Sequence, residues 1–232
     1  MRYVISDIHG EYDLFVALLD KINFTPSDTI YICGDIIDKG KNSIKLARMI
    51  YQMPNAKCIL GNHEYDFLKY YWGLMRNSPS DFDAVLAQLQ QYYPDGSDML
   101  NWELVDWIES LPFYIEEKDF ICVHAGVPLD REGRIIPLEK ATPEQLVYDR
   151  EFKEHSVQVN GGKCVFFGHT PTSYLEQSDG KIIAYLRPQH KGSSIDDYYK
   201  VHLDLGTWMS GMLGCFCIET CKCIYVTKND TI

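Results

Sequence analysis

Aspartate, asparagine and histidine side chains follow short hydrophobic runs at several places in the sequence. In the clearest case, Asp35 follows the run Ile30-Tyr31-Ile32-Cys33 and precedes Asp38 and Lys39 by a few residues. A short run of β-branched and aromatic residues that ends at a polar residue is typical of a buried strand. The other side chains in this position are Asp7, His9, Asn62, His63, His124 and His169. Because ligands of α/β proteins bind beyond the carboxyl ends of the strands, we expect these side chains to meet in one crevice.

This set of side chains has the composition of a site for two metal ions. Carboxylate, imidazole and amide ligands suit borderline divalent ions such as Mn, Fe or Zn, and one carboxylate can bridge two of them. Asp35 is the best candidate for the bridge, because it stands in the chain between Asp7 and His9 and the later candidates. A single histidine after a strand is more often a structural residue, so the hypothesis depends on the recurrence of the pattern.

Five motifs in the sequence resemble those of the calcineurin-like metallophosphoesterases, in the same order. They are Asp7-Ile8-His9-Gly10, Gly34-Asp35-Ile36-Ile37-Asp38-Lys39-Gly40, Gly61-Asn62-His63-Glu64, His124-Ala125-Gly126 and Gly168-His169-Thr170. Within that superfamily, the chain is most similar to the phosphoprotein phosphatase branch in its compact bacterial and phage form. The resemblance extends from Met1 to about Gly214, and an ordered set of motifs is far more specific than any one of them.

The resemblance implies two divalent metal ions, with Mn as the expected metal and Fe, Zn or Ni as alternatives. One ion would be held by Asp7, His9 and Asp35, and the other by Asp35, Asn62, His124 and His169. Two ions about 3.5–4 Å apart lower the pKa of a shared water, which can then attack phosphorus directly as a bridging hydroxide. The implied reaction is therefore the hydrolysis of a phosphoester without a covalent phosphoenzyme.

The same resemblance assigns roles to four further side chains. His63 would donate a proton to the leaving group, and Asp38 would orient and charge-stabilise that imidazole. Lys39 and Arg150 would bind the phosphoryl oxygens. Phosphoprotein phosphatases usually carry Arg at the position of Lys39, and lysine offers a point charge in place of a bidentate fork. Arg150 matches only by its place between the His124 and His169 motifs; otherwise it is a surface arginine in an acidic stretch.

Length and charge restrict the class of protein further. The chain has 232 residues, 46% of them hydrophobic, and a formal net charge of −11. This length permits a substantial core, and we expect one domain over residues 1–232. A polyanion would be repelled, so we expect no nucleic-acid partner. Neither a membrane span nor a signal peptide is evident, which predicts a cytoplasmic protein without a membrane partner. The sequence does not indicate the oligomeric state.

The eight cysteines are interpreted as free thiols. Cys33, Cys58, Cys122 and Cys164 fall within predicted buried strands, where cysteine acts as a small apolar residue. The remaining four are Cys215, Cys217, Cys221 and Cys223. A structural zinc site is one explanation of these four, but their spacing is explained more simply by two alternating strands that meet at Glu219-Thr220.

Hydrophobic periodicity divides the chain into three parts. Helices are predicted at residues 12–22 and 43–51, between the first ligand-bearing strands, which indicates parallel βαβ units. Residues 64–111 are predicted as a helical insertion, with helices at 65–75, 82–91 and 102–111. Its aromatic residues are explained by packing, with substrate contact as the alternative. Strands are predicted at 182–185, 201–205, 214–218 and 222–226, and these suggest an antiparallel second sheet.

These elements predict a mixed α/β fold. The resemblance implies the four-layer architecture of its family, a two-sheet β-sandwich flanked by helices. The leading hypothesis for function is a metal-dependent phosphatase that acts on phosphoserine, phosphothreonine or phosphotyrosine in proteins. The alternative is hydrolysis of symmetrical dinucleoside polyphosphates such as diadenosine tetraphosphate, or of another small phosphoester. A non-catalytic binding module and a purely structural metal site are disfavoured, because all the motif residues are present and the ligand set is poor in cysteine.

Overall fold

The fold consists of two mixed β-sheets that pack face to face. The computed structural model describes residues 1–77, 80–93, 99–176 and 178–231. Each sheet has five strands, in the orders β10-β9-β1-β2-β3 and β4-β5-β6-β8-β7. The strands are β1 (Arg2–Ile5), β2 (Thr29–Ile32), β3 (Ala56–Cys58), β4 (Tyr114–Glu116), β5 (Phe120–Val123), β6 (Cys164–Phe167), β7 (Ile183–Leu186), β8 (Tyr198–His202), β9 (Met212–Cys217) and β10 (Lys222–Thr227).

The predicted metal ligands follow parallel strands of both sheets. In the first sheet β1, β2 and β3 are parallel, with Val4 opposite Tyr31 and Tyr31 opposite Lys57. In the second sheet β5, β6 and β8 are parallel, and β4 and β7 pair with them antiparallel at the two edges. Parallel neighbours end at the same edge of a sheet, so the loops that follow them gather there.

Most of the α-helices in the described residues lie where the sequence predicts them. They are α1 (Tyr12–Lys21), α2 (Ser43–Tyr51), α3 (Asn62–Asn77), α4 (Phe82–Tyr92), α5 (Trp102–Ser110), α6 (Pro143–Tyr148) and α7 (Thr207–Ser210). Side chains cap several of them: Asp81 accepts a hydrogen bond from the amide of Ala84, and Asn101 from that of Leu104. The sequence predictions did not include α6 and α7, which are short.

Three hydrophobic cores define the layers. The core between the sheets contains Val4 and Tyr31 from the first sheet and Phe120 and Phe166 from the second. A second core lies between the first sheet and helices α1 and α2, and a third lies between the outer face of the second sheet and α6. The mixed α/β class and the two-sheet sandwich flanked by helices are thereby confirmed.

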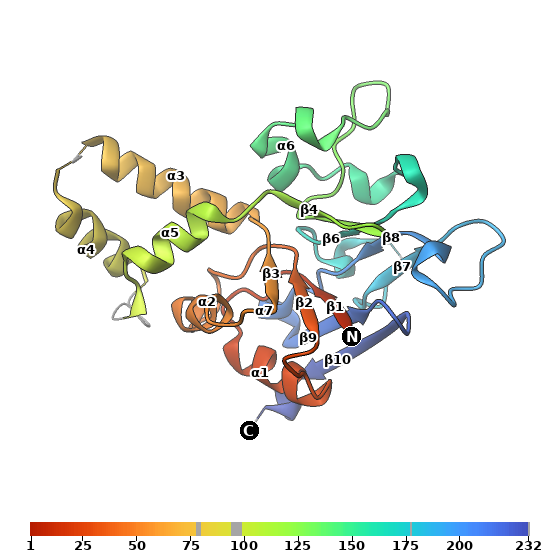
Figure 1. The fold of residues 1–232 in the computed structure, drawn as a ribbon, viewed down its shortest axis with the longest axis horizontal. Coiled ribbons are helices and arrows are strands. Elements are labelled where there is room, and N and C mark those ends of the chain that lie inside the picture. Colours follow the sequence, from red (N-terminus) through yellow and green to blue (C-terminus); the bar gives the residue numbers. More distant parts are fainter. Residues whose placement is uncertain (78–79, 94–98, 177, 232) are drawn as a thin grey trace.

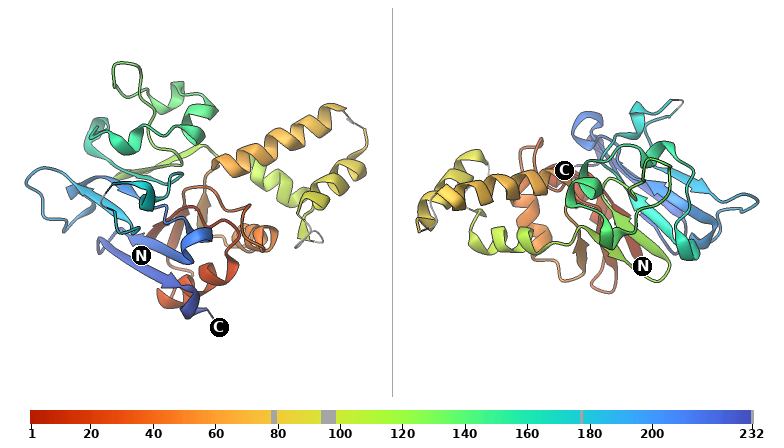
Figure 2. Two further views of the ribbon diagram at one scale, coloured as in Figure 1. Left: turned by 180° about the vertical axis from the view of Figure 1, so that it is seen from behind. Right: turned by 90° about the horizontal axis from the view of Figure 1, so that it is seen from above.

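The helices α3, α4 and α5 project from one side of the sandwich (Figures 1 and 2). Their apolar faces pack on one another through buried residues such as Leu68, Val85, Leu89 and Val105. The aromatic residues in this segment divide into two groups. Tyr71 and Tyr93 are buried, whereas Tyr70 and Tyr92 are exposed. The division of the chain into domains stays a prediction.

The arrangement of the carboxyl-terminal strands differs from the prediction. We expected residues 214–218 and 222–226 to join an antiparallel second sheet, but β9 pairs antiparallel with β1 and thus extends the first sheet. The second sheet is therefore mainly parallel at its centre. Alternating hydrophobicity indicates that a strand exists and which face it buries, but not which neighbour it pairs with.

One strand boundary was also predicted wrongly. The strand expected at residues 201–205 is observed three residues earlier, as β8 (Tyr198–His202). The difference arises at Lys200, a charged residue that belongs to the strand. Its side chain is buried, and Nζ donates hydrogen bonds to the carbonyls of Phe152, Lys153 and His155 at 3.0, 2.9 and 2.8 Å.

The four carboxyl-terminal cysteines lie in a β-hairpin, as alternation predicts. Cys215 faces Ile224 across the hairpin and Cys223 faces Phe216. Cys215 and Cys217 belong to the core beneath α1, whereas Cys221 and Cys223 pack against the core between the sheets. Thiols on opposite faces of one hairpin do not converge on a common ion. All eight cysteines are free.

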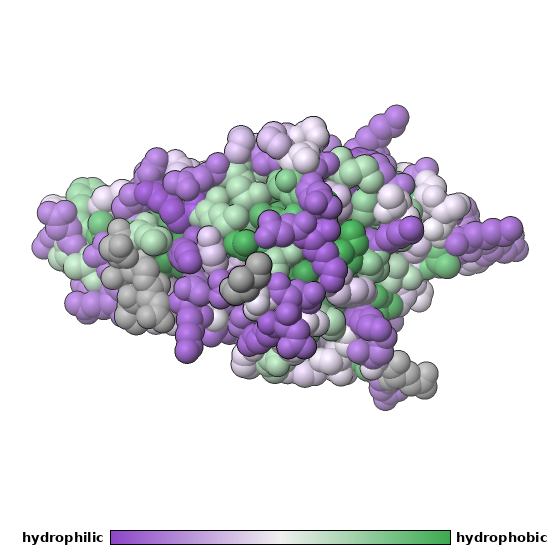
Figure 3. Space-filling model, turned by 90° about the horizontal axis from the view of Figure 1, so that it is seen from below, coloured by the Kyte–Doolittle hydropathy of each residue, from purple (hydrophilic) through white to green (hydrophobic). Residues whose placement is uncertain are grey.

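No helix among the described residues is both long and apolar enough to cross a membrane. On the face of the molecule seen in Figure 3, hydrophobic residues gather toward the middle and are interrupted by hydrophilic ones.

Candidate metal centre

Residues that the sequence singled out lie together where the strands of the two sheets end. The loops after β1, β2 and β3 bring Asp7, Asp35 and Asn62, and the loops after β5 and β6 bring His124 and His169. We had expected these strands to aim at the edge of one sheet, but they belong to two sheets that meet at this end.

The backbone of these loops adopts an uncommon conformation. Six non-glycine residues with positive φ, between 50° and 69°, belong to the predicted site: Asp7, His9, Asp35, Asp38, Lys39 and His169. Positive φ is unfavourable for most side chains, although Asp and His tolerate it better than others. Such strain clusters at functional sites, where it fixes the direction in which side chains point.

Asp35 lies at the centre of the cluster, with one carboxylate oxygen toward each side. Its Oδ2 is 3.5 Å from Nε2 of His9, and its Oδ1 is 3.5 Å from Nε2 of His124. The side chain belongs to two groups of potential ligands, one with His9 and His63 and the other with His124 and His169. This is the geometry that a bridging carboxylate requires, and the role of bridge stays a prediction.

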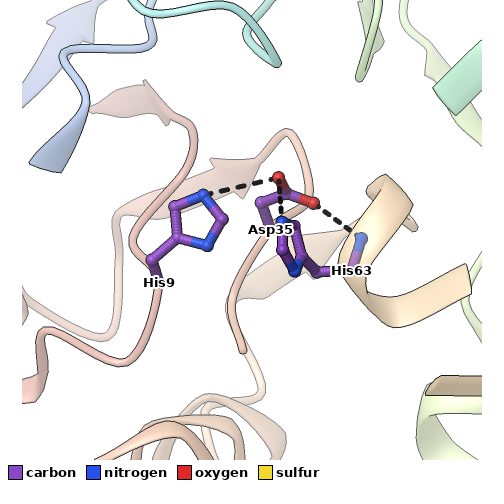
Figure 4. A group of neighbouring side chains, drawn as sticks. All are labelled: His9, Asp35 and His63. Atoms are coloured by element: carbon purple, nitrogen blue, oxygen red, sulfur yellow. Dashed lines mark hydrogen bonds and ion pairs between the residues drawn. The ribbon is translucent and has the colours of Figure 1, made fainter. Parts of the chain in front are cut away.

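On the first side, Nε2 of His9 faces Asp35. Its Nδ1 donates to the carbonyl of Ile37 at 3.1 Å, which leaves Nε2 as the acceptor. Oδ1 of Asp7 is 3.9 Å from this Nε2. Figure 4 shows that the rings of His9 and His63 both turn toward the carboxylate of Asp35.

On the second side, Asn62 joins the two histidines. Its Oδ1 lies 3.1 Å from Nε2 of His124 and 2.8 Å from Nδ1 of His169. Nδ1 of His124 donates to the carbonyl of Cys33 at 2.7 Å, so its Nε2 also carries a lone pair. Asp35, His124 and His169 each offer a ligand atom within 4.8 Å of the others, and Asn62 contacts both histidines.

The electrostatics of this cluster fit bound cations. Asp7 and Asp35 are 1% and 2% exposed, and burial, followed by the charges of Asp7 and Glu64, raises the pKa of Asp35 well above its ordinary value. Burial also lowers the pKa of His9 and of His169 to about 2, so both rings are neutral. Nε2 of His169 is buried without a hydrogen-bond partner among the described residues. Neutral imidazoles and buried carboxylates form a donor set that divalent cations would stabilise.

His63 and Asp38 form a pair at the edge of the cluster. Nδ1 of His63 lies 2.7 Å from Oδ2 of Asp38, and its Nε2 is 3.9 Å from Oδ2 of Asp35. Burial acts to lower the pKa of His63, but the hydrogen bond to Asp38 and the charge of Asp35 outweigh it, so the pKa is raised. By distance alone, His63 is as close to Asp35 as Asp7 is to His9, so a ligand role and a proton-donor role both fit.

Two cationic side chains border the cluster. Nζ of Lys39 is 3.0 Å from Nε2 of His9 and 5.5 Å from the centre of the Trp208 ring. Arg150 donates from Nη1 to Oγ1 of Thr170 at 3.1 Å, beside His169. Both residues are exposed. Each lies where it could bind a phosphoryl group held at the cluster, and these roles stay predictions.

Two glycines make room for the buried carboxylates. A Cβ added at Gly61 would collide with Oδ1 of Asp35, and one at Gly168 with Oδ2 of Asp7. Each glycine stands one residue before a predicted ligand, Asn62 or His169. The absence of a side chain there allows loops from different strands to approach closely.

Sequence reasoning missed three residues of the site. Glu64 is buried and accepts hydrogen bonds from the amides of Gly61, Asp35, Ile36 and Ile37 at 2.8–3.0 Å, and so fixes the Asp35 loop. Asp204 is buried, and burial together with the charge of Asp7 raises its pKa. The third is Tyr93, whose hydroxyl donates to Oδ1 of Asp38.

The sequence held a signal for two of them. Asp204 follows the hydrophobic residues of β8 in the same way as the predicted ligands follow theirs, and Glu64 belongs to a matched motif. The contact of Tyr93 depends on how α4 packs against the sandwich, for which we found no signal in the sequence.

The sequence profile of the calcineurin-like phosphoesterases matches residues 2–202. The chain belongs to this family, whose members use a centre of two divalent metal ions.

Similar curated proteins are symmetrical bis(5'-nucleosyl)-tetraphosphatases. The protein of Salmonella paratyphi C (strain RKS4594) is 35% identical over 129 residues, which are 54% of this chain and 43% of that protein. The protein of Salmonella typhi is 34% identical over 127 residues, with the same coverage of 54% and 43%. The matched segment therefore spans less than half the length of these relatives.

Solved structures agree with the fold. One, provisionally described as a diadenosine tetraphosphatase, is 20% identical with a TM-score of 0.65, and the match covers 97% of this chain and 92% of that one. A mutant of a cold-active protein tyrosine phosphatase is 17% identical with a TM-score of 0.62 and covers 99% and 78%. At these identities the likeness shows the fold alone.

Proposed function

We propose that this chain hydrolyses symmetrical dinucleoside polyphosphates, with diadenosine tetraphosphate as the representative substrate. The observation that carries the proposal is the 35% identity over 129 residues to a symmetrical bis(5'-nucleosyl)-tetraphosphatase. A phosphoprotein substrate, our first expectation from the motifs, has no comparable support. The replacement of the usual arginine by Lys39 also distinguishes the chain from phosphoprotein phosphatases.

Six side chains would hold the two metal ions: Asp7, His9, Asp35, Asn62, His124 and His169. When bound, the ions would polarise the phosphoryl group and lower the pKa of a water at neutral pH. The buried carboxylates and neutral imidazoles are suited to this task. The metal identity is part of the proposal, with Mn first and Fe, Zn or Ni as alternatives.

The side chains around the ligands would handle the substrate and its leaving group. Lys39 and Arg150 bind the negatively charged phosphoryl oxygens from two sides. His63 donates a proton to the leaving oxygen, and Asp38 holds the ring through Nδ1 at 2.7 Å, so that Nε2 carries the proton to be transferred. In symmetrical cleavage the leaving group is a nucleoside diphosphate.

A substrate panel tests the proposal. We would measure metal content and the hydrolysis of diadenosine tetraphosphate, a phosphoserine peptide and p-nitrophenyl phosphate with Mn, Fe, Zn and Mg. We expect diadenosine tetraphosphate to yield ADP as the only nucleotide product, at a kcat/KM well above that of the peptide. Hydrolysis of the peptide with no reaction of the dinucleotide would reverse the assignment to a phosphoprotein phosphatase.

A further inference from the structure

A cavity of about 360 Å³ adjoins the candidate metal centre, and the proposed chemistry so far leaves it unused. It lies between the end of α4 and the loop that follows β2. The lining residues are Asp38, Lys39, Gly40, Lys41, Ser43, Tyr92 and Tyr93. Its volume is at the lower end of the range for small-molecule sites, about 300–1,000 Å³.

The two walls of the cavity differ in chemistry. The loop after β2 contributes the exposed side chains of Lys39 and Lys41, which give positive charge in a chain with a formal net charge of −11. The end of α4 contributes two aromatic rings. Tyr92 is 65% exposed, and its ring centre lies 5.2 Å from that of Tyr93 and 5.8 Å from that of Tyr70. The Tyr92 ring thus has two aromatic neighbours and is still largely exposed at the cavity.

A ligand for these walls must combine negative charge with a flat aromatic group. Phosphate groups suit the two lysines, and a base can stack on tyrosine in the way that bases stack on aromatic residues of nucleic-acid-binding proteins. A phosphopeptide would use the lysines but would leave the exposed ring without a partner. A nucleoside diphosphate satisfies both walls.

The position of the cavity indicates which half of a dinucleotide it would bind. Asp38 lines the cavity with one side and holds His63 with the other, and Tyr93 donates to the second oxygen of the same carboxylate. A proton donor must touch the leaving oxygen. Lys39 lines the cavity as well, and its Nζ lies 3.0 Å from Nε2 of His9 in the candidate metal centre, so a phosphate chain that leaves the centre can enter the cavity along this lysine.

We infer that this cavity binds the departing nucleoside diphosphate, with its phosphates at Lys39 and Lys41 and its base on Tyr92. The inference rests on the proposed function and specifies where one half of that substrate lies. Tyr93 lines the cavity and connects it to the proton donor through its hydrogen bond to Asp38.

Three variants separate the parts of this site. Tyr92→Leu removes the ring, Tyr92→Phe keeps it, and Lys41→Gln removes one charge. Phe82→Leu is the matched control, because Phe82 is the first residue of α4 and is also an aromatic residue with 52% of its surface exposed. For each Mn-loaded protein we would measure ADP and adenosine binding by calorimetry. We would also measure the ratio of kcat/KM for diadenosine tetraphosphate to kcat/KM for p-nitrophenyl phosphate.

We expect Tyr92→Leu to weaken binding of both ADP and adenosine by about tenfold and to lower the kcat/KM ratio by a similar factor, since base stacking contributes at this level. Tyr92→Phe and Phe82→Leu should behave as wild type. Lys41→Gln should weaken ADP binding but not adenosine binding.

The failures of the two proposals are distinguishable. A wild-type protein that cleaves diadenosine tetraphosphate, together with a Tyr92→Leu variant that matches Phe82→Leu in all measurements, would overturn the cavity assignment and leave the proposed function standing. A wild-type protein that cleaves p-nitrophenyl phosphate but not the dinucleotide would overturn both. ADP binding that weakens equally in Tyr92→Leu and Tyr92→Phe would exclude stacking.

Discussion

At the scale of single residues, Asp35 holds the candidate centre together, because its two oxygens face different groups of histidines. Its burial, with Asp7 and Glu64 nearby, makes the negative charge unfavourable without a cation. The position of this residue could be predicted because a hydrophobic run ends directly before the loop that carries it. The orientation of its two carboxylate oxygens toward different histidines could not be predicted, because it depends on how loops from separate sheets approach one another.

Two roles, metal ligand and proton donor, fit the position of His63, and a substitution distinguishes them. We expect His63→Asn to keep its full metal content and to lose about 100-fold or more in kcat, because the leaving oxygen then lacks its acid. Metal analysis beside steady-state kinetics checks this. The loss should be greater for an alkyl phosphate than for p-nitrophenyl phosphate, whose leaving group needs little help. A variant that loses one metal ion would identify His63 as a ligand instead.

Gly168 tests the close approach of the loops. Gly168→Ala should weaken metal binding by about 10-fold to 100-fold, because a methyl group would displace the Asp7 carboxylate. Gly73→Ala provides the control, since a Cβ there meets only the end of the Arg76 side chain at 3.9 Å. Because both glycines could affect folding, metal titrations should accompany urea denaturation. Equal metal affinity in the two variants would contradict the packing argument.

At the scale of elements, the helical segment α3–α5 and strand β8 make contacts that could not be predicted from the sequence. The positions of α1 to α5 were predicted from periodicity, and they agree with the structure to within three residues at either end. The contact of Tyr93 with Asp38 depends on the tertiary position of α4, and the start of β8 depends on a lysine that is buried because three carbonyls accept its hydrogen bonds. Neither feature can be predicted from the local hydrophobic pattern of the sequence.

Tyr93 tests whether the helical segment supports the proton donor. Tyr93→Phe removes only the hydroxyl that donates to Asp38, so we expect kcat to fall by about tenfold while KM changes little. The comparison of kcat with KM for diadenosine tetraphosphate checks this, and the matched control is Tyr71→Phe, a buried tyrosine of α3. Equal kinetics for the two variants would limit Tyr93 to a packing role.

Lys200 provides a prediction for pH. Burial lowers its pKa to about 8, whereas lysine in the unfolded chain titrates near about 10.4. Between these values the unfolded chain binds more protons than the folded one, so the contribution of Lys200 to the free energy of unfolding rises with pH from about 8 to about 10. Urea denaturation at several pH values, with Lys200→Met as reference, should show this rise in the wild type alone. Parallel pH curves would contradict it.

At the scale of the whole molecule, the sandwich could be expected from the family resemblance but not from pattern alone. Strand β9 shows why. Its alternation is equally compatible with either sheet, and only the pairing with β1 places it in the first. The location of the loops that carry the candidate ligands, at one end of the sandwich, could be predicted more directly, because parallel strands end at the same edge.

Metal removal should affect the stability of the entire fold. Two ions that bind only the folded chain stabilise it by mass action, and we expect a chelator to lower the thermal midpoint by about 5–10 °C. Differential scanning calorimetry with and without Mn checks this. In an Asp35→Asn variant, which lacks the central carboxylate, the chelator should have little effect. A wild-type midpoint that is independent of metal would count against a two-ion centre.

The candidate ligands are divided between the sheets: Asp7, His9, Asp35 and Asn62 follow strands of the first sheet, and His124 and His169 follow strands of the second. During synthesis, the amino-terminal half emerges from the ribosome before His124 and His169, two of the four candidate ligands of the second cation. Catalytic activity would thus arise only when the second sheet has packed on the first, so that activity reports that both sheets have folded.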